Sequence, residues 1–131
     1  MIIDKLAWLC IKNKKLLVVR SHNKEVFYIP GGKRDSGESD ITALCREIEE
    51  ELSVKLIHDT ILYATTITAQ AHAKPLGTEV KITSYFAEYK GELKINNEIA
   101  ELAWVDSTNQ HITSMNTQMI IQWLISQKML V

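Results

Sequence analysis

Residues 31–54 read GGKRDSGESDITALCREIEEELSV and combine a glycine-rich loop with an amphipathic segment. The paired glycines end the apolar run before them, because glycine adopts backbone conformations that are closed to other residues. After Ser39, apolar residues recur at spacings of three and four, which is typical of one face of a helix; they are Ile41, Leu44, Cys45, Ile48 and Leu52. The pattern predicts a helix over residues 39–53.

Three glutamates share one flank of this predicted helix. Glu47 precedes Glu50 by three positions and Glu51 by four, so their carboxylates crowd within one turn and repel one another. One interpretation is a solvated charged face. The other is a bound divalent cation, because carboxylate oxygens and a backbone carbonyl from the glycine loop are hard ligands that suit Mg²⁺ or Mn²⁺. Such a cation can bridge phosphate oxygens and activate a water that attacks phosphorus.

The segments around this helix read mainly as strands. Before it, residues 5–11 and 16–20 predict two strands joined by a tight hairpin, and residues 26–29 predict a third. After it, we expect two strand segments in 54–71, a loop at 72–78, a long strand at 80–89, a turn at 91–97, a short strand at 102–105 and a closing helix at 115–129. The inward residues of that closing helix are expected to be Met119, Ile120, Ile121, Trp123 and Leu124. This order predicts an α/β or α+β fold with a mixed sheet covered by helices.

Composition limits the class of protein. The 131 residues predict a single domain over residues 1–131, and 15 basic against 16 acidic residues argue against a broad nucleic-acid-binding surface. The apolar runs are short for a membrane helix, and the first fifteen residues lack a secretory cleavage site. We therefore expect a cytoplasmic protein without a membrane partner. Cys10 and Cys45 lack metal-ligand spacing, and we expect both in the core.

The glycine-to-helix segment resembles the Nudix box, GX5EX7REUXEEXGU with U apolar. The matching residues are Gly32, Glu38, Arg46, Glu47, Ile48, Glu50, Glu51 and Val54. Ser53 stands where the family has glycine, at a helix end that favours a left-handed backbone. With weaker features the resemblance extends over about residues 6–106. It implies an α/β/α sandwich around a mixed, partly antiparallel sheet.

The resemblance also implies roles for individual residues. It makes Gly32, Glu38, Glu47, Glu50 and Glu51 candidate metal ligands, Glu38 holding the loop as the alternative for that residue. Arg46 would orient the glutamates, and the base that activates water would be Glu50 or a glutamate outside the box. For that outside glutamate we prefer Glu98 to Glu101, the alternative for either being an exposed carboxylate at a strand edge.

Positively charged residues near this segment are candidates for contact with a polyanionic substrate. The candidate substrate-binding residues are Arg20, Lys33 and Lys74, with Lys24 and Arg34 adding positive charge nearby. The loop that carries His72 and Lys74 either covers the substrate or is an ordinary exposed loop. The tryptophans, Trp8, Trp104 and Trp123, are expected in the core rather than stacked on a nucleobase.

The resemblance favours a Mg²⁺-dependent (or Mn²⁺-dependent) Nudix hydrolase of the MutT-like kind. Its substrate would be a small nucleotide, a nucleoside triphosphate or another nucleoside diphosphate derivative, cleaved at a pyrophosphate linkage by water attack at phosphorus. No nucleic-acid polymer is expected as a partner, and a homodimer stays open. Two alternatives remain: a non-hydrolytic nucleotide-binding or regulatory module, and an isomerase of allylic diphosphates that would need a reactive cysteine near the site.

Overall fold

The computed structural model describes residues 1–71 and 74–131. The helices are α1 (Asp40–Leu52) and α2 (Met115–Ser126), with short 3₁₀ turns η1 (His58–Thr60) and η2 (Gln110–Ile112). The strands are β1 (Ile2–Leu9), β2 (Ile11–Lys12), β3 (Lys15–Ser21), β4 (Gly31–Gly32), β5 (Lys55–Leu56), β6 (Leu62–Gln70), β7 (Glu79–Phe86), β8 (Tyr89–Lys90) and β9 (Ile99–Val105). None of the helices in these residues is both long and apolar enough to cross a membrane.

The largest sheet is mixed and has the strand order β4-β1-β7-β6. β1 runs parallel to β7 and antiparallel to β4, whereas β6 runs antiparallel to β7. A second sheet has the order β2-β3-β9 with antiparallel pairs, and β5 pairs with β8. The expected mixed, partly antiparallel sheet is therefore confirmed.

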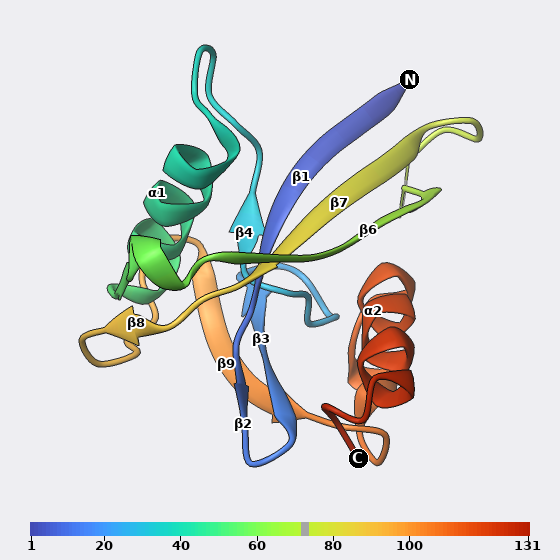
Figure 1. Ribbon diagram of the computed structural model, residues 1–131. Coiled ribbons are helices and arrows are strands. Elements are labelled where there is room, and N and C mark those ends of the chain that lie inside the picture. Colours follow the sequence, from blue (N-terminus) through green and yellow to red (C-terminus); the bar gives the residue numbers. More distant parts are fainter. Residues whose placement is uncertain (72–73) are drawn as a thin grey trace.

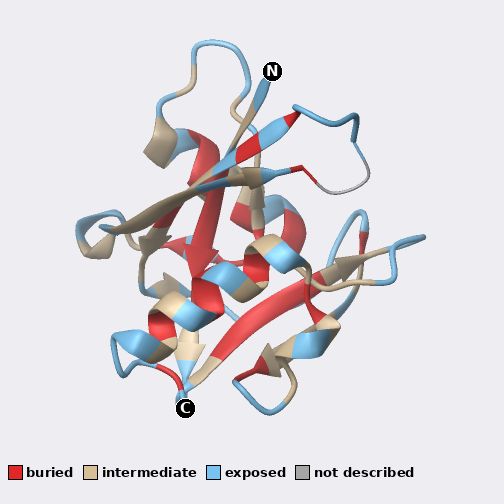
Figure 2. Cartoon of the chain, turned by 90° about the vertical axis from the view of Figure 1, so that its right-hand side faces the viewer, coloured by how far each residue is buried: buried red, intermediate tan, exposed pale blue. Residues whose placement is uncertain are grey.

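The two helices lie on opposite sides of the strands (Figure 1). Because side chains alternate along a strand, each central strand contributes to two cores. Leu6 and Trp8 of β1 pack in the cluster that contains α1, whereas Ala7 and Leu9 pack with residues of α2. Figure 2 shows the buried residues concentrated in the strands and helices, between exposed loops. The layered α/β/α arrangement expected from the resemblance is present.

Helix α1 begins and ends as predicted. The Ser39 hydroxyl accepts a hydrogen bond from the Thr42 N–H at 3.2 Å, and Ser53 has the left-handed backbone φ 62°, ψ 22°. The buried face differs from the predicted one, because it comprises Ala43, Leu44, Ile48, Glu51 and Leu52. Ile41 and Cys45 are only partly buried. The helix is turned so that a glutamate, rather than these two apolar residues, faces the glycines of β4.

Three other predictions need correction. The hairpin is shorter than predicted, because the chain leaves β1 at Cys10 and only β2 pairs with β3, around a turn in which Asn13 and Lys14 have φ 51° and 59°. Residues 26–29 form no strand, since only Phe27 and Tyr28 make isolated bridges. Met119 is 45% exposed, since α2 turns Thr117, Ile120, Ile121 and Leu124 inward. Trp8 is fully buried as expected, whereas Trp104 and Trp123 are half-buried.

Candidate active site

A cavity of about 560 Å³ lies on the α2 side of β1 and β7. Its floor comes from alternate residues of these strands, among them Ile3, Lys5, Val80 and Ile82. Glutamates approach it from α1 and from the loop before β9, and the N-terminal end of α2 contributes polar residues; these lining residues are Glu47, Glu51, Glu98, Ser114, Asn116 and Thr117. The cavity therefore combines carboxylates, lysines and an apolar floor.

The two glycines of β4 allow α1 to approach closely. A methyl group on Gly32 would lie 2.6 Å from the carboxyl carbon of Glu47, and one on Gly31 would collide with the backbone of Leu6. Gly31 also has φ 147°. Its N–H donates a hydrogen bond to Glu51 at 3.3 Å. Glycine is thus required at position 31 by the strand pairing, whereas at position 32 it leaves room for the present position of the Glu47 carboxylate.

Glu51 is the most buried carboxylate of the cavity. It is 2% exposed, and burial, followed by the negative charges of Glu47 and Glu98, raises its pKa to about 8 although the Gly31 N–H lowers it. Burial likewise raises the pKa of Glu47, against the opposing effect of Arg46. Both shifts reflect negative charge held away from water, which is unfavourable unless a cation compensates it.

Arg46 connects the glycine-rich loop to the glutamates. Its guanidinium donates to Glu38 at 2.8 Å, to Glu47 at 3.1 Å and to Glu50 at 3.3 Å. Glu38 also accepts the Asp35 N–H at 2.7 Å. The hydrogen bonds from Arg46, then from the Asp35 backbone, lower the pKa of Glu38 to about 2. The ionised Glu38 holds the glycine-rich loop through these hydrogen bonds. The same ion pairs raise the pKa of Arg46.

The donor set fits a hard divalent cation. Glu51 forms no ion pair in the described part of the chain, where Arg46 is the only ion-pair partner of Glu47. Within the described ranges, no three metal-ligating side chains converge as a preformed centre. Glu47 lies one helical turn before Glu51, and its charge is near enough to raise the pKa of Glu51. Carboxylate oxygens and backbone carbonyls are the hard ligands that suit Mg²⁺ and Mn²⁺.

Glu98 and Glu101, the two candidate bases outside α1, have different surroundings in the structure. The loop before β9 is fastened to the end of α1, where the Asn96 N–H and the Asn97 side chain donate to the carbonyls of Glu51 and Glu50, each at 3.0 Å. This brings Glu98 to the cavity. Glu101 instead forms an ion pair with Arg20 at 2.8 Å and is 54% exposed.

The other candidate residues fall into two groups. Lys24, Lys33 and Lys74 line the cavity. Arg20 and Arg34 do not line it, since Arg20 pairs with Glu101 and Arg34 with Asp4 and Asp40. Glu50 also stands outside the lining set, with its side chain 48% exposed. His72 lies outside the described residues.

Sequence reasoning overlooked several lining residues. Lys5, Tyr28, Asn116 and Thr117 all face the cavity. The sequence did contain a signal for Lys5, because it is a charged residue in the otherwise apolar run that follows Asp4. No local pattern distinguishes the two α2 residues from other polar positions near a helix start.

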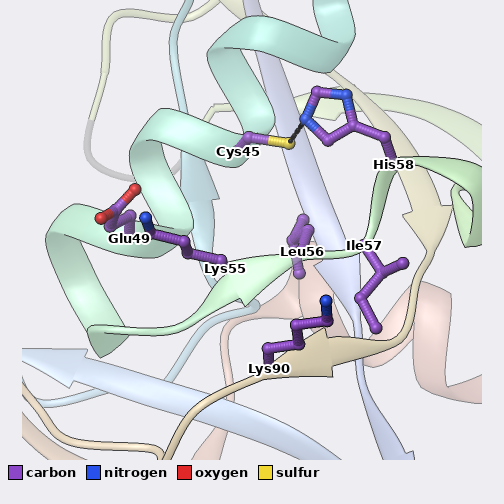
Figure 3. Close-up of a pocket in the computed structure, with 7 residues that line it drawn as sticks. All are labelled: Cys45, Glu49, Lys55, Leu56, Ile57, His58 and Lys90. Carbon is purple, nitrogen blue, oxygen red and sulfur yellow. Dashed lines mark hydrogen bonds between the residues drawn. The ribbon is translucent and has the colours of Figure 1, made fainter.

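A second cavity, of about 420 Å³, lies on the other side of α1 (Figure 3). The Cys45 Sγ contacts the His58 Nε2 at 3.5 Å there. Cys45 is only half-buried and packs against the edge of the core cluster that contains α1, so the expectation of a core position is met in part, whereas Cys10 is buried as expected. Burial, then the charge of Glu49, raises the pKa of the Cys45 thiol. A protonated thiol outside the glutamate cavity is not the reactive cysteine that an isomerase would need.

Comparisons with known proteins agree with this geometry. The NUDIX domain family matches residues 6–117. The fold is similar to that of a NUDIX hydrolase from Nitrosomonas europaea, with 17% identity, a TM-score of 0.78, and coverage of 98% of this chain and 91% of the other. It is also similar to a MutT NUDIX hydrolase from Burkholderia pseudomallei, with 20% identity, a TM-score of 0.75, and coverage of 93% and 97%.

A third similar structure carries ligands. It is a bifunctional NMN adenylyltransferase/ADP ribose pyrophosphatase from Francisella tularensis complexed with AMP and a Mn ion, with 16% identity, a TM-score of 0.70, and coverage of 97% of this chain and 42% of the other. A search of curated proteins found no match. The chain belongs to the NUDIX domain family, and hence to the Nudix-type pyrophosphohydrolases, which act on phosphoric anhydrides of small nucleotides with the help of a divalent metal.

Proposed function

We propose that this protein hydrolyses a pyrophosphate linkage in a nucleoside triphosphate or another nucleoside diphosphate derivative, with Mg²⁺ as cofactor. The proposal rests on one observation: Glu47 and the buried Glu51 line the same cavity as several lysines. A cation-binding end and an anion-binding wall in one cavity suit a metal-bound phosphate chain.

Glu47 and Glu51 would hold the metal, with the carbonyl of Gly32 as a backbone donor and Glu50 or Glu38 as further candidates. The bound metal supplies charge neutralisation for the phosphate oxygens and lowers the pKa of a coordinated water. Arg46 fixes the loop through Glu38 and orients Glu47. Mn²⁺ would serve in place of Mg²⁺, which is supported by the Mn ion in the Francisella structure.

A carboxylate of this chain would take the proton from the attacking water. Glu98 lines the cavity and makes no ion pair with a described residue, which favours it as the base, whereas Glu50 is held by Arg46 outside the lining. As the proton moves to the carboxylate, the water oxygen bonds to phosphorus and the bridging P–O bond breaks. The leaving phosphate takes the bonding electron pair.

The test is release of phosphate or pyrophosphate from a panel of nucleoside triphosphates, oxidised nucleotides, ADP-ribose, nucleotide sugars and dinucleoside polyphosphates, with Mg²⁺ and with EDTA. Loss of the base should lower kcat by about a hundredfold or more in Glu98→Gln or in Glu50→Gln. Glu92→Gln, on an exposed turn, is the matched control and should retain full activity. Turnover that persists in EDTA, or in both base variants, would refute the assignment.

A further inference from the structure

Lys5 occupies an unusual position in the cavity. Residues Ile3, Lys5 and Ala7 of β1 all line it, because alternate residues of a strand share one face. The neighbour of Lys5 across the parallel pair is Ile82, which lines the cavity too. A single ammonium group thus rises from a floor that is otherwise apolar.

This ammonium group lacks a protein counter-ion. Lys5 forms no ion pair within 4.0 Å among residues 1–71 and 74–131, and the same holds for the other lining lysines, Lys24, Lys33 and Lys74. By contrast, Arg20, Arg34 and Arg46 all have carboxylate partners. Lysines without an ion pair also lie elsewhere on the surface, but Lys5, Lys24, Lys33 and Lys74 are brought together around one cavity.

The lysines are close enough to affect one another. Lys5 is exposed to solvent, but partial desolvation lowers its pKa, and the charges of Lys33 and Lys74 lower it further, while Glu51 opposes them. Gathering like charges around a partly apolar cavity is unfavourable, and the free energy is recovered when an anion binds between them. Glu51 offsets part of this repulsion but forms no ion pair with Lys5 in the described residues, so an anionic ligand would add a contact that the protein does not supply.

We propose that Lys5 binds a phosphate group of the substrate that the metal does not hold. The proposal rests on the proposed function and deepens it, since it names the substrate class. A nucleoside triphosphate carries more negative charge than a nucleotide sugar, whose diphosphate a single divalent cation already neutralises. The four lysines that line the cavity favour a triphosphate over the diphosphate of a nucleotide sugar. Lys5 contributes to that preference from the cavity floor.

The first experiment measures binding of inorganic tripolyphosphate in Mg²⁺ by calorimetry, so that the unknown base plays no part. Lys5→Met should weaken the affinity by about tenfold or more, the usual effect of losing a charge-assisted contact, and Lys5→Arg should restore most of it. The control is Lys81→Met on the adjacent strand, which is exposed and does not line the cavity. Thermal unfolding of each variant checks that the fold is intact.

The second experiment compares kcat/KM for a nucleoside triphosphate and for the nucleotide sugar of the same base. Lys5→Met should reduce the ratio of the two values, whereas Lys81→Met should leave it unchanged. Equal binding of tripolyphosphate by Lys5→Met and the unmodified protein, or absence of binding by both, would overturn the proposal. If no nucleotide is hydrolysed but tripolyphosphate binding depends on Lys5, the proposed function alone fails.

Discussion

Replacing Glu51 with glutamine should stabilise the metal-free protein and remove most of the pH dependence of its stability. The pKa of this buried carboxyl group is raised from 4.5 to about 8. The folded state therefore holds the proton more tightly than the unfolded state does. Its destabilising effect is absent below about pH 4.5, grows as the pH rises, and is complete above about pH 8. At about 1.4 kcal/mol per pH unit, the effect reaches about 3 kcal/mol at pH 7 and about 5 kcal/mol above pH 8.

The assay is urea unfolding in EDTA at pH 5 and at pH 8.5, with the unmodified protein and the Glu51→Gln variant. Glutamine can still accept the Gly31 N–H, so the variant should be more stable by several kcal/mol at the higher pH and nearly equal at the lower pH. Adding Mg²⁺ should stabilise the unmodified protein and not the variant, because only a state that binds the ion gains from it. Glu49→Gln, at an exposed position of the same helix, is the control. A variant that unfolds with the same pH dependence as the unmodified protein would refute the reasoning.

Three further substitutions test other parts of the site. Gly32→Ala places a methyl group 2.6 Å from the movable carboxyl end of Glu47, so calorimetry should show Mg²⁺ affinity reduced by about tenfold while the melting temperature stays nearly unchanged. Wild-type affinity in that variant would contradict the placement of Glu47. Ser53→Gly should raise the free energy of unfolding by about 0.5 to 1 kcal/mol in a urea titration, since the residue has φ 62°. A decrease would mean that the 3.2 Å contact between the Ser53 hydroxyl and Asn96 outweighs the backbone strain. Glu101→Gln should change kcat/KM by less than about twofold in the nucleotide assay, because its exposed ion pair lies outside the cavity. A large loss there would return Glu101 to the candidates for the base.

Local patterns were sufficient for the glycine-to-helix segment. The caps at Ser39 and Ser53 depend on a few neighbouring residues, and the helix between them follows from the spacing of its apolar residues. The two glycines themselves were predicted less well, because Gly31 and Gly32 pair with β1 as the short strand β4 instead of ending a strand over residues 26–29. The mixed sheet with helices on it followed from the order of elements.

Pairing between distant strands was beyond these patterns. The parallel pair of β1 and β7 joins segments that lie more than half the chain apart, and an apolar run does not indicate its partner. The predicted hairpin was too long for this reason, since most of β1 has a better partner than β3. The buried face of α2 was also predicted incorrectly at Met119, because an apolar helix has several faces of similar hydrophobicity.

The sequence by itself indicated the candidate glutamates and glycines of the site, since these residues stand at fixed spacings along one loop and helix. Only the tertiary structure decided their environments. It buries Glu51 and brings Glu98 to the cavity, whereas Glu101 pairs with Arg20. It also places Lys5 on the floor of the cavity. Spacing along a helix is a local property of the chain, whereas burial and charge pairing depend on which distant segments pack together.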